Sequence, residues 1–149
     1  LNKQGKLGAL FIDYLNLINI VVSKNQLQET TDLALGSIAR KTKLMAEEME
    51  IPVILLAQLN REVDRRQGLH FPVLSDLRNS GAIEQVADVV IFVYRAEKYN
   101  ITYDPKTKED LRGVGLLLVA KNRNGATGAA KFRYNPAMTC LMDYDPRVI

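Results

Sequence analysis

Two short apolar runs on either side of a long amphipathic stretch constrain the fold of this chain most strongly. The first run, Leu7–Ile12, stops at Asp13, and the second, Val53–Ala57, follows Pro52, which cannot continue a helix. Both runs have the length and composition of strands that are buried on both faces. Strand, helix and strand in this order predict a parallel pair joined by a right-handed crossover. Between the runs, core-facing residues recur every three or four positions, as on one side of a helix: Leu35, Ile38, Ala39, Thr42, Met45, Ala46 and Met49.

The second half of the chain is predicted to add further strands. Asp88–Tyr94 is a third continuous apolar and β-branched run, and we expect it to be a third buried strand. Two more strand-like segments, Val114–Lys121 and Ala129–Tyr134, flank the pair Asn124 and Gly125. This pair favours a hairpin, because both residues tolerate the positive φ angles that such turns need.

The connecting segments are predicted to be polar. Asn60–Ser75 is expected to be a mobile loop, and Ser80 is positioned to cap a short helix over Gly81–Val86. Asn100–Arg112 is charged and is expected to be an exposed insertion, whereas the tail, Met138–Tyr144, is a candidate for one more strand. Residues 1–149 show no repeat or linker, so they are predicted to form one domain or the larger part of one.

Composition narrows the class of protein. A chain of 149 residues with 47% apolar content is long enough for one domain with a core. The net charge of +3 permits nucleic-acid binding without requiring it. No apolar run approaches the ~20 residues of a membrane span. Asp13 interrupts the first apolar stretch, which argues against a signal sequence. We therefore expect a cytoplasmic protein with no membrane partner.

Cysteine and histidine are too scarce for a structural zinc site. The chain has one of each, Cys140 and His70, so an internal disulfide is excluded as well. Cys140 lies near Met138, Leu141 and Met142 and is expected to be a buried thiol. His70 is expected to be structural or incidental.

Polar residues follow the predicted strands at the positions where ligands bind in parallel sheets. Asp13 closes the first strand, Gln58 follows the second, and a loop opens at Ser75. An acid at such a strand end can hold Mg²⁺ through water beside phosphates, and an amide there can hydrogen-bond a γ-phosphate or its attacking water. Strand-ending aspartates are also common without a function, and Gln58 alone is better explained as a polar strand terminus.

Four segments together resemble the C-terminal motor domain of the DnaB family of replicative DNA helicases. They are IDYLNL (residues 12–17), LAQLN (56–60), SDLRNSGAIEQVADVVIF (75–92) and KNRNGATG (121–128). Their order and spacing match over roughly Leu7 to Asp143. The resemblance implies an α/β fold of the RecA-like P-loop NTPase type. Such a fold has a mostly parallel sheet flanked by helices, with a C-terminal antiparallel hairpin.

The resemblance assigns roles at the nucleotide site. Asp13 takes the metal-side position of the Walker B strand, and Gln58 takes the phosphate-sensing position. Lys121 and Arg123 match a basic pair that reaches the nucleotide of the neighbouring subunit, where an arginine stabilises transition-state charge. A solvated basic turn or a direct contact to DNA phosphate is the alternative for this pair. Asn122 stands where relatives often carry Gln.

The resemblance also implies a single-stranded DNA contact. Arg78 and the backbone N–H groups of Asn79 to Gly81 are expected to grip a phosphate without reading sequence. Relatives often have Glu at the position of Asn79, which leaves a side-chain role there open. A basic cluster after the sensor, formed by Arg61, Arg65 and Arg66, is as consistent with a DNA channel as with a solvated loop.

No G-x-x-x-x-G-K-S/T loop occurs anywhere in the sequence. Residues 1–149 are therefore expected to be a single partial domain that lacks the P-loop half of the motor. The resemblance implies a parent that forms a hexameric ring, powered by ATP and Mg²⁺, with primase and a helicase loader as partners. The isolated chain is predicted not to hydrolyse ATP, because a phosphate cradle supplies most of the grip on nucleotide.

Two other functions stay open at this point. One is a different RecA-like ATPase, such as a recombinase-type or phage primase-helicase protein, although the segment DLRNSGAIEQ favours the DnaB type. The other is a non-catalytic module that binds DNA or joins a helicase ring to regulate it.

Overall fold

The computed structural model describes residues 7–15, 31–77, 81–135, 137 and 139–145. The chain forms two compact units. The first unit comprises the described residues of 1–60 and 74–87, and the second comprises those of 61–73 and 88–149. Arg78, Asn79 and Ser80 lie outside the described residues, so the predicted phosphate contact of Arg78 and the predicted Ser80 cap are not tested by the structure.

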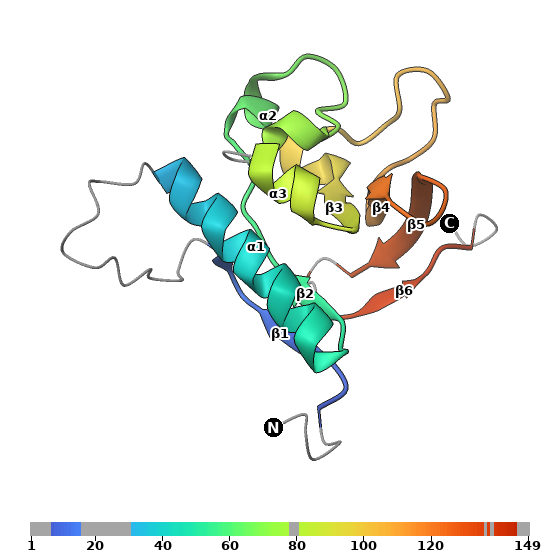
Figure 1. Cartoon of the computed structure of the whole chain (residues 1–149). Helices are drawn as coiled ribbons and strands as arrows, with labels where there is room; N and C mark the ends of the chain where they lie inside the picture. The colour runs from blue at the N-terminus through green and yellow to red at the C-terminus, as the bar shows by residue number, and fades with distance from the viewer. Residues whose placement is uncertain (1–6, 16–30, 78–80, 136, 138, 146–149) are drawn as a thin grey trace. The chain divides into compact units, whose positions relative to one another are not determined.

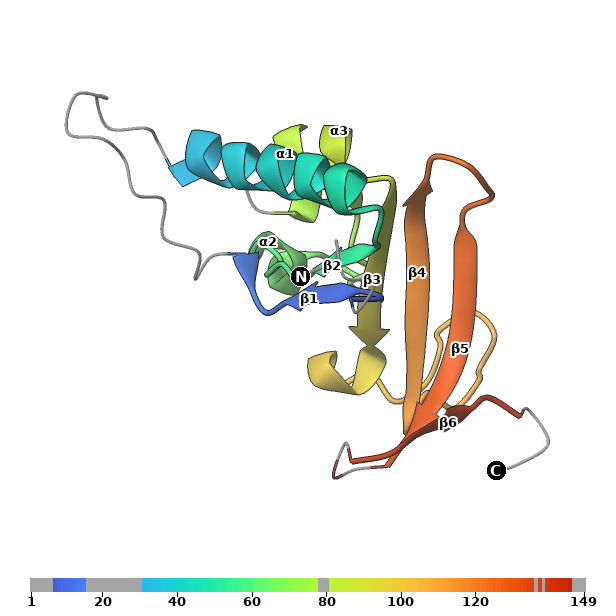
Figure 2. The same ribbon diagram turned by 60° about the horizontal axis from the view of Figure 1, so that its bottom comes forward.

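The first unit contains the predicted strand–helix–strand arrangement. Strand β1 (Leu10–Ile12) and strand β2 (Val53–Leu55) are parallel, with Leu10 opposite Val53 and Ile12 opposite Leu55. Helix α1 (Thr31–Met49) connects them and lies along one side of the pair (Figures 1 and 2). The helix ends where expected, because Glu50 adopts a left-handed φ of 52° and Pro52 follows.

The core of the first unit lies between α1 and a second helix, α3 (Gly81–Val86). The predicted apolar face of α1 is buried at Leu35, Ile38 and Ala39, where it packs with Ile83 of α3. Leu15, which follows β1, is 1% exposed and completes this cluster. The helices approach closely at Gly36, because a Cβ built there would lie 2.6 Å from Cβ of Ala82.

The second unit is built on a four-stranded antiparallel sheet in the order β3-β4-β5-β6. Strand β3 (Val89–Arg95) pairs with β4 (Val114–Asn122), which forms the predicted hairpin with β5 (Gly128–Tyr134). The tail contributes β6 (Leu141–Asp143), paired with the end of β5. Figure 2 shows β3, β4 and β5 side by side, with β6 at one end of the sheet.

The predicted mostly parallel sheet is confirmed only for β1 and β2, since every strand pair described in the second unit is antiparallel. The expectation that β3 is buried on both faces is wrong for this chain. Val90, Phe92 and Tyr94 are buried, but Val93, on the other face, is 67% exposed. A continuous apolar run predicts that both faces of a strand are buried. In β3, the described residues bury only one face.

The segment Asn60–Ser75, predicted to be a mobile loop, instead has defined structure over residues 61–73. It contains the short helix α2 (Glu62–Arg65), and the His70 ring stacks on Tyr99 with 4.6 Å between ring centroids. His70 Nδ1 also lies 3.1 Å from the carbonyl oxygen of Val63, and the Tyr94 hydroxyl donates to the carbonyl of Leu69. These contacts give His70 a structural role, which is one of the two alternatives expected for it.

Cys140 is exposed, so the predicted buried thiol is wrong. The residue lies just before β6, whose Leu141 and Met142 are themselves 64% and 48% exposed. Its N–H donates to Oδ1 of Asn135 at 3.2 Å, within a turn between β5 and β6. The apolar neighbours of Cys140 predicted burial, but Leu141 and Met142 belong to the edge strand β6 and are exposed. None of the helices that the structure describes is long and apolar enough to cross a membrane.

Candidate nucleotide and DNA site

Asp13 and Gln58 lie at the same edge of the parallel pair in the first unit. Asp13 directly follows β1, and Gln58 comes three residues after the end of β2. Backbone hydrogen bonds continue past both strand ends. The N–H of Leu56 donates to the carbonyl of Ile12 at 3.0 Å, and the N–H of Leu15 donates to the carbonyl of Leu56 at 2.9 Å. Both polar side chains are exposed. This arrangement offers a carboxylate and an amide to a ligand at the carboxyl ends of the strands.

The donor set at this edge fits a magnesium ion held mainly by a nucleotide. Among the described residues, no group of three or more His, Cys, Asp or Glu side chains could hold a metal by itself. Mg²⁺ in phosphate sites commonly keeps its waters and takes only one or two carboxylates. The exposed carboxylate of Asp13 is compatible with that mode of binding.

The segment that carries Gln58 is bonded to the segment that leads into the predicted DNA loop. Leu59 and Leu77 form an antiparallel bridge, and the N–H of Asn60 donates to the carbonyl of Asp76 at 2.7 Å. Asp76 ends a short 3-10 helix, η3 (Leu74–Asp76), and is 3% exposed. Leu77, the last described residue before the loop, is therefore bridged to the residue that follows Gln58.

Gly81, the third residue of the predicted DNA contact, is exposed at the first position of α3. A Cβ built on Gly81 would meet no atom within 4 Å, so packing does not demand a glycine there. A bare backbone at this position is instead compatible with close approach by a ligand.

The hairpin β4–β5 presents Lys121 and Arg123 in the second unit. Lys121 is half-buried near the end of β4, and Arg123 is exposed at the start of the turn. The register of β3 and β4 shifts between Val90 and Ile91, which pair with Lys121 and Val119. Ala120 is thus an extra residue of β4, and a bulge of this kind re-aims the side chains that follow it.

The turn forms where the sequence predicts it, but for a different reason. Neither Asn124 nor Gly125 has a positive φ. Asn122 closes the turn instead, because its Nδ2 donates to the carbonyl of Ala126 at 3.2 Å. A Cβ on Gly125 would lie 2.6 Å from that Nδ2, so the glycine provides room for the Asn122 amide.

Arg123 has a partner that sequence reasoning missed. Its Nη1 lies 2.8 Å from Oδ1 of Asp88, and its N–H donates to the carbonyl of the same residue, also at 2.8 Å. Asp88 immediately precedes β3, opposite the end of β4. The sequence would predict this pair only if the antiparallel pairing of β3 with β4 were already known.

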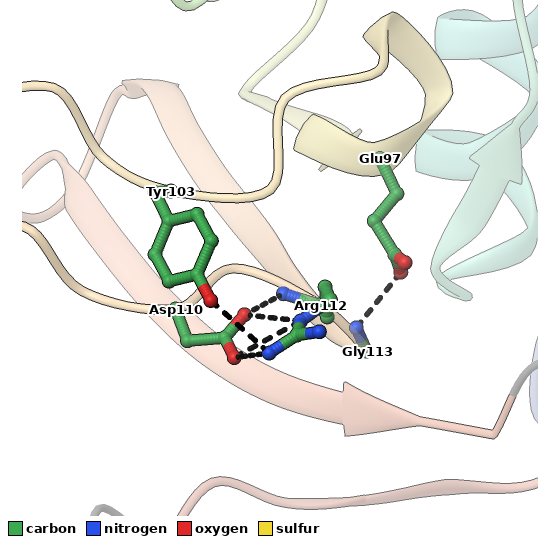
Figure 3. A network of polar contacts seen from close by, with 5 residues as sticks. All are labelled: Glu97, Tyr103, Asp110, Arg112 and Gly113. Carbon is green, nitrogen blue, oxygen red and sulfur yellow. Dashed lines mark hydrogen bonds and ion pairs between the residues drawn. The ribbon is translucent and has the colours of Figure 1, made fainter.

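The insertion between β3 and β4 is fastened by a polar network rather than extending freely (Figure 3). Glu97, in the 3-10 helix η4 (Ala96–Tyr99), accepts from the N–H of Gly113 at 2.8 Å and from the Tyr134 hydroxyl at 2.5 Å. These two bonds, the one from Tyr134 first, lower the pKa of Glu97. The side-chain hydrogen bonds of Arg112 lower the pKa of Asp110 to about 2.

The three arginines of the predicted basic cluster, Arg61, Arg65 and Arg66, differ in exposure and in their contacts. Arg61 and Arg65 are exposed, whereas Nη1 of Arg66 donates to the carbonyl of Phe71 at 2.5 Å. Arg66 therefore contributes to the fold of its own segment.

Comparison with known proteins identifies the family of the chain. Residues 1–143 match the DnaB-like helicase C terminal domain. The replicative DNA helicase DnaB of Buchnera aphidicola subsp. Acyrthosiphon pisum is 38% identical over 129 residues, which are 87% of this chain and 26% of the relative. That of Geobacillus stearothermophilus is 38% identical over 134 residues, covering 90% and 27%. The chain thus spans about a quarter of the length of these relatives.

Two solved structures share the fold. One is an ATPase domain that superposes with a TM-score of 0.80 at 29% identity, covering 96% of this chain and 48% of that domain. A DnaB-like replicative helicase, described with its interactions with primase, gives 0.79 at 30% identity and covers 97% and 34%. The recognised motifs, the fold and these similarities lead to one assignment: the chain belongs to the family of DnaB-like helicase C-terminal domains.

Proposed function

We propose that this chain is the C-terminal part of the ATP-driven motor of a ring-shaped replicative DNA helicase, most simply a hexamer that moves 5′ to 3′ on single-stranded DNA. The observation that carries the proposal is the shared edge of β1 and β2, where Asp13 and Gln58 follow parallel strands. Family membership supports the same interpretation, since the matched relatives are replicative DNA helicases.

At the nucleotide, each side chain has a distinct task. Asp13 would hold the water shell of Mg²⁺, and this ion would neutralise phosphate charge during hydrolysis. Gln58 would hydrogen-bond the γ-phosphate or the attacking water. Lys121 and Arg123 would approach the nucleotide of the adjacent subunit, so that hydrolysis depends on ring assembly.

The bridge between the Gln58 segment and the DNA loop supports a route for coupling. A shift of Gln58 on loss of the γ-phosphate would move Leu59 and Asn60, which are bonded to Leu77 and Asp76. Residues 78–80 follow directly, and Arg78 with the amides of Asn79 to Gly81 would release or regrip a DNA phosphate. Contacts to backbone phosphate suit a motor that steps along any sequence.

The test compares the isolated chain with the full-length protein that carries a P-loop. The isolated chain should show no ATPase activity, whereas the full-length protein should hydrolyse ATP and separate the strands of a forked DNA. Asp13→Asn should abolish both activities there while leaving ring assembly intact. ATP turnover by the isolated chain that disappears on Asp13→Ala would refute the need for a second half. Forked DNA left intact by an ATP-hydrolysing ring would favour another RecA-like ATPase.

A non-catalytic module that binds DNA or joins a helicase ring to regulate it is the second candidate. The isolated chain would then enter preformed rings of a DnaB-type helicase and change their ATPase rate. Native mass spectrometry of such mixtures distinguishes the candidates, because a motor fragment should not displace complete subunits.

A further inference from the structure

One residue, Asp88, holds Arg123 at two points. The main-chain carbonyl of Asp88 accepts from the Arg123 N–H at 2.8 Å, and Oδ1 lies 2.8 Å from Nη1 of the guanidinium. The neighbouring cross-strand pair is Val89 and Asn122, so Asp88 and Arg123 continue the ladder of β3 and β4 by one step. Backbone and side chain of the arginine are thus fixed relative to the same strand end.

The geometry leaves the arginine within reach of another molecule. The side chains of Arg123 and Asp88 are 46% and 42% exposed. A guanidinium is a rigid planar fork of five N–H donors, so a carboxylate that holds one of its nitrogens orients the whole fork. The extra residue Ala120 in β4 re-aims the end of this strand just before Arg123.

We infer that Asp88 is the positioning residue of Arg123: it orients the guanidinium that acts on the nucleotide of the neighbouring subunit. The inference rests on the proposed function of Arg123. Pre-ordering the long arginine side chain lowers the entropy lost when it meets transition-state charge, so Asp88 raises the rate of hydrolysis without touching nucleotide.

An exposed ion pair can also be a neutral surface feature, and many such pairs contribute little. A matched pair in the same unit provides the comparison. Asp110 and Arg112 form an ion pair with similarly exposed side chains, 39% and 58%, in the insertion between β3 and β4. Asp110→Asn removes the same charge from an aspartate–arginine pair that has no part in the proposed nucleotide site.

The experiment measures steady-state ATPase activity of rings of the full-length protein, with ring assembly followed by mass photometry. Asp88→Asn should lower kcat about two- to fivefold, the range that an exposed ion pair can supply, with KM unchanged. Asp88→Glu should restore most of the loss. Asp110→Asn should leave kcat at the wild-type value. Arg123→Ala should lower kcat far more, and adding Asp88→Asn to Arg123→Ala should cause no further loss.

The controls distinguish the proposed role of Asp88 from the proposed role of Arg123. An unchanged kcat in Asp88→Asn rings, alongside a large loss in Arg123→Ala rings, would overturn the positioning role and leave the proposed function intact. A further loss in the double variant would also overturn it, because Asp88 would then act independently of Arg123. An unchanged kcat in Arg123→Ala rings would refute the role of Arg123 itself, and with it the role of Asp88.

Discussion

The contact between Tyr134 and Glu97 shows how single polar residues fasten the second unit. The buried Tyr134 hydroxyl donates to Oε2 of Glu97 at 2.5 Å, and Oε2 also accepts from the N–H of Gly113. Burial first, and then the carboxylate, raises the pKa of Tyr134 to about 12. The same hydroxyl is the main cause of the lowered pKa of Glu97. Both groups therefore keep the charge states that suit this bond across neutral pH.

We predict that Tyr134→Phe lowers the free energy of unfolding at neutral pH by about 1 kcal/mol, because it removes a hydrogen bond to a charged group that is partly screened by solvent. The pKa of Glu97 is lower in the folded state than its usual 4.5. Its stabilisation is therefore present above that value and disappears as the pH falls through the folded-state pKa. Urea unfolding at neutral and acidic pH should show the difference between wild type and Tyr134→Phe narrowing in acid.

The exposed Tyr103 supplies the control for that measurement. Its hydroxyl accepts from Arg112 at 3.2 Å, and its side chain is 52% exposed. Tyr103→Phe should change the unfolding free energy by less than about 0.5 kcal/mol at any pH. An equal effect of the two substitutions would contradict the assignment of the stabilisation to Glu97.

At the residue scale, a sequence reveals functional candidates that directly follow an apolar strand. It does not reveal contacts between residues that are brought together only by the pairing of two strands. Asp13 and Gln58 could be proposed because each follows an apolar strand, which a linear pattern reveals. The partnership of Asp88 with Arg123 needs the register of β3 and β4, including the extra residue Ala120. Cys140 was misassigned because apolar neighbours do not distinguish a core strand from an edge strand.

At the scale of elements, the packing of α1 against α3 depends on a glycine that periodicity does not mark. Sequence patterns predicted both helices, since core positions recur along α1 and Ser80, a candidate cap, precedes α3. The helices approach closely at Gly36, where an added Cβ would lie 2.6 Å from Cβ of Ala82. Neither of these atoms lies at the end of a flexible side chain, so a side chain at position 36 would have to push the helices apart.

We predict that Gly36→Ala destabilises the first unit by about 1–3 kcal/mol, the usual cost of overpacking, despite the better helix propensity of alanine. Gly81→Ala is the matched control, because a Cβ at Gly81 meets nothing within 4 Å. It should be neutral or stabilising by up to about 1 kcal/mol. Thermal unfolding followed by far-UV circular dichroism checks both. Equal stability of the two variants would contradict the close approach at Gly36.

At the scale of the whole molecule, the chain exposes apolar surface that its sequence marks for burial. Phe11 of β1 is 69% exposed and Val93 of β3 is 67% exposed, although both lie in runs that were predicted to be covered on both faces. Val93 lies opposite Leu117 of β4, which is 38% exposed, so this surface extends across two strands. The predicted burial on both faces is wrong for the described chain, because an apolar run contains no information about which part of a protein would cover it.

The solved ATPase domain that shares this fold is about twice the length of this chain, which covers 48% of it. We expect the remainder of such a domain to cover the exposed faces of β1 and β3. The isolated chain should therefore bind a hydrophobic dye and self-associate, because large exposed apolar patches favour association. Phe11→Lys and Val93→Lys should each reduce dye fluorescence and shift sedimentation towards the monomer. Thr139→Lys, which adds the same charge at an exposed polar site, should change neither.

Dye binding by the full-length protein tests whether other parts of the same chain cover the exposed faces of β1 and β3. Dye binding by the wild type should then be low, because the apolar faces are buried within the complete domain. Phe11→Lys should destabilise the full-length fold, since the substitution would bury an unpaired charge. Strong dye binding by the full-length protein would mean that these faces serve another partner.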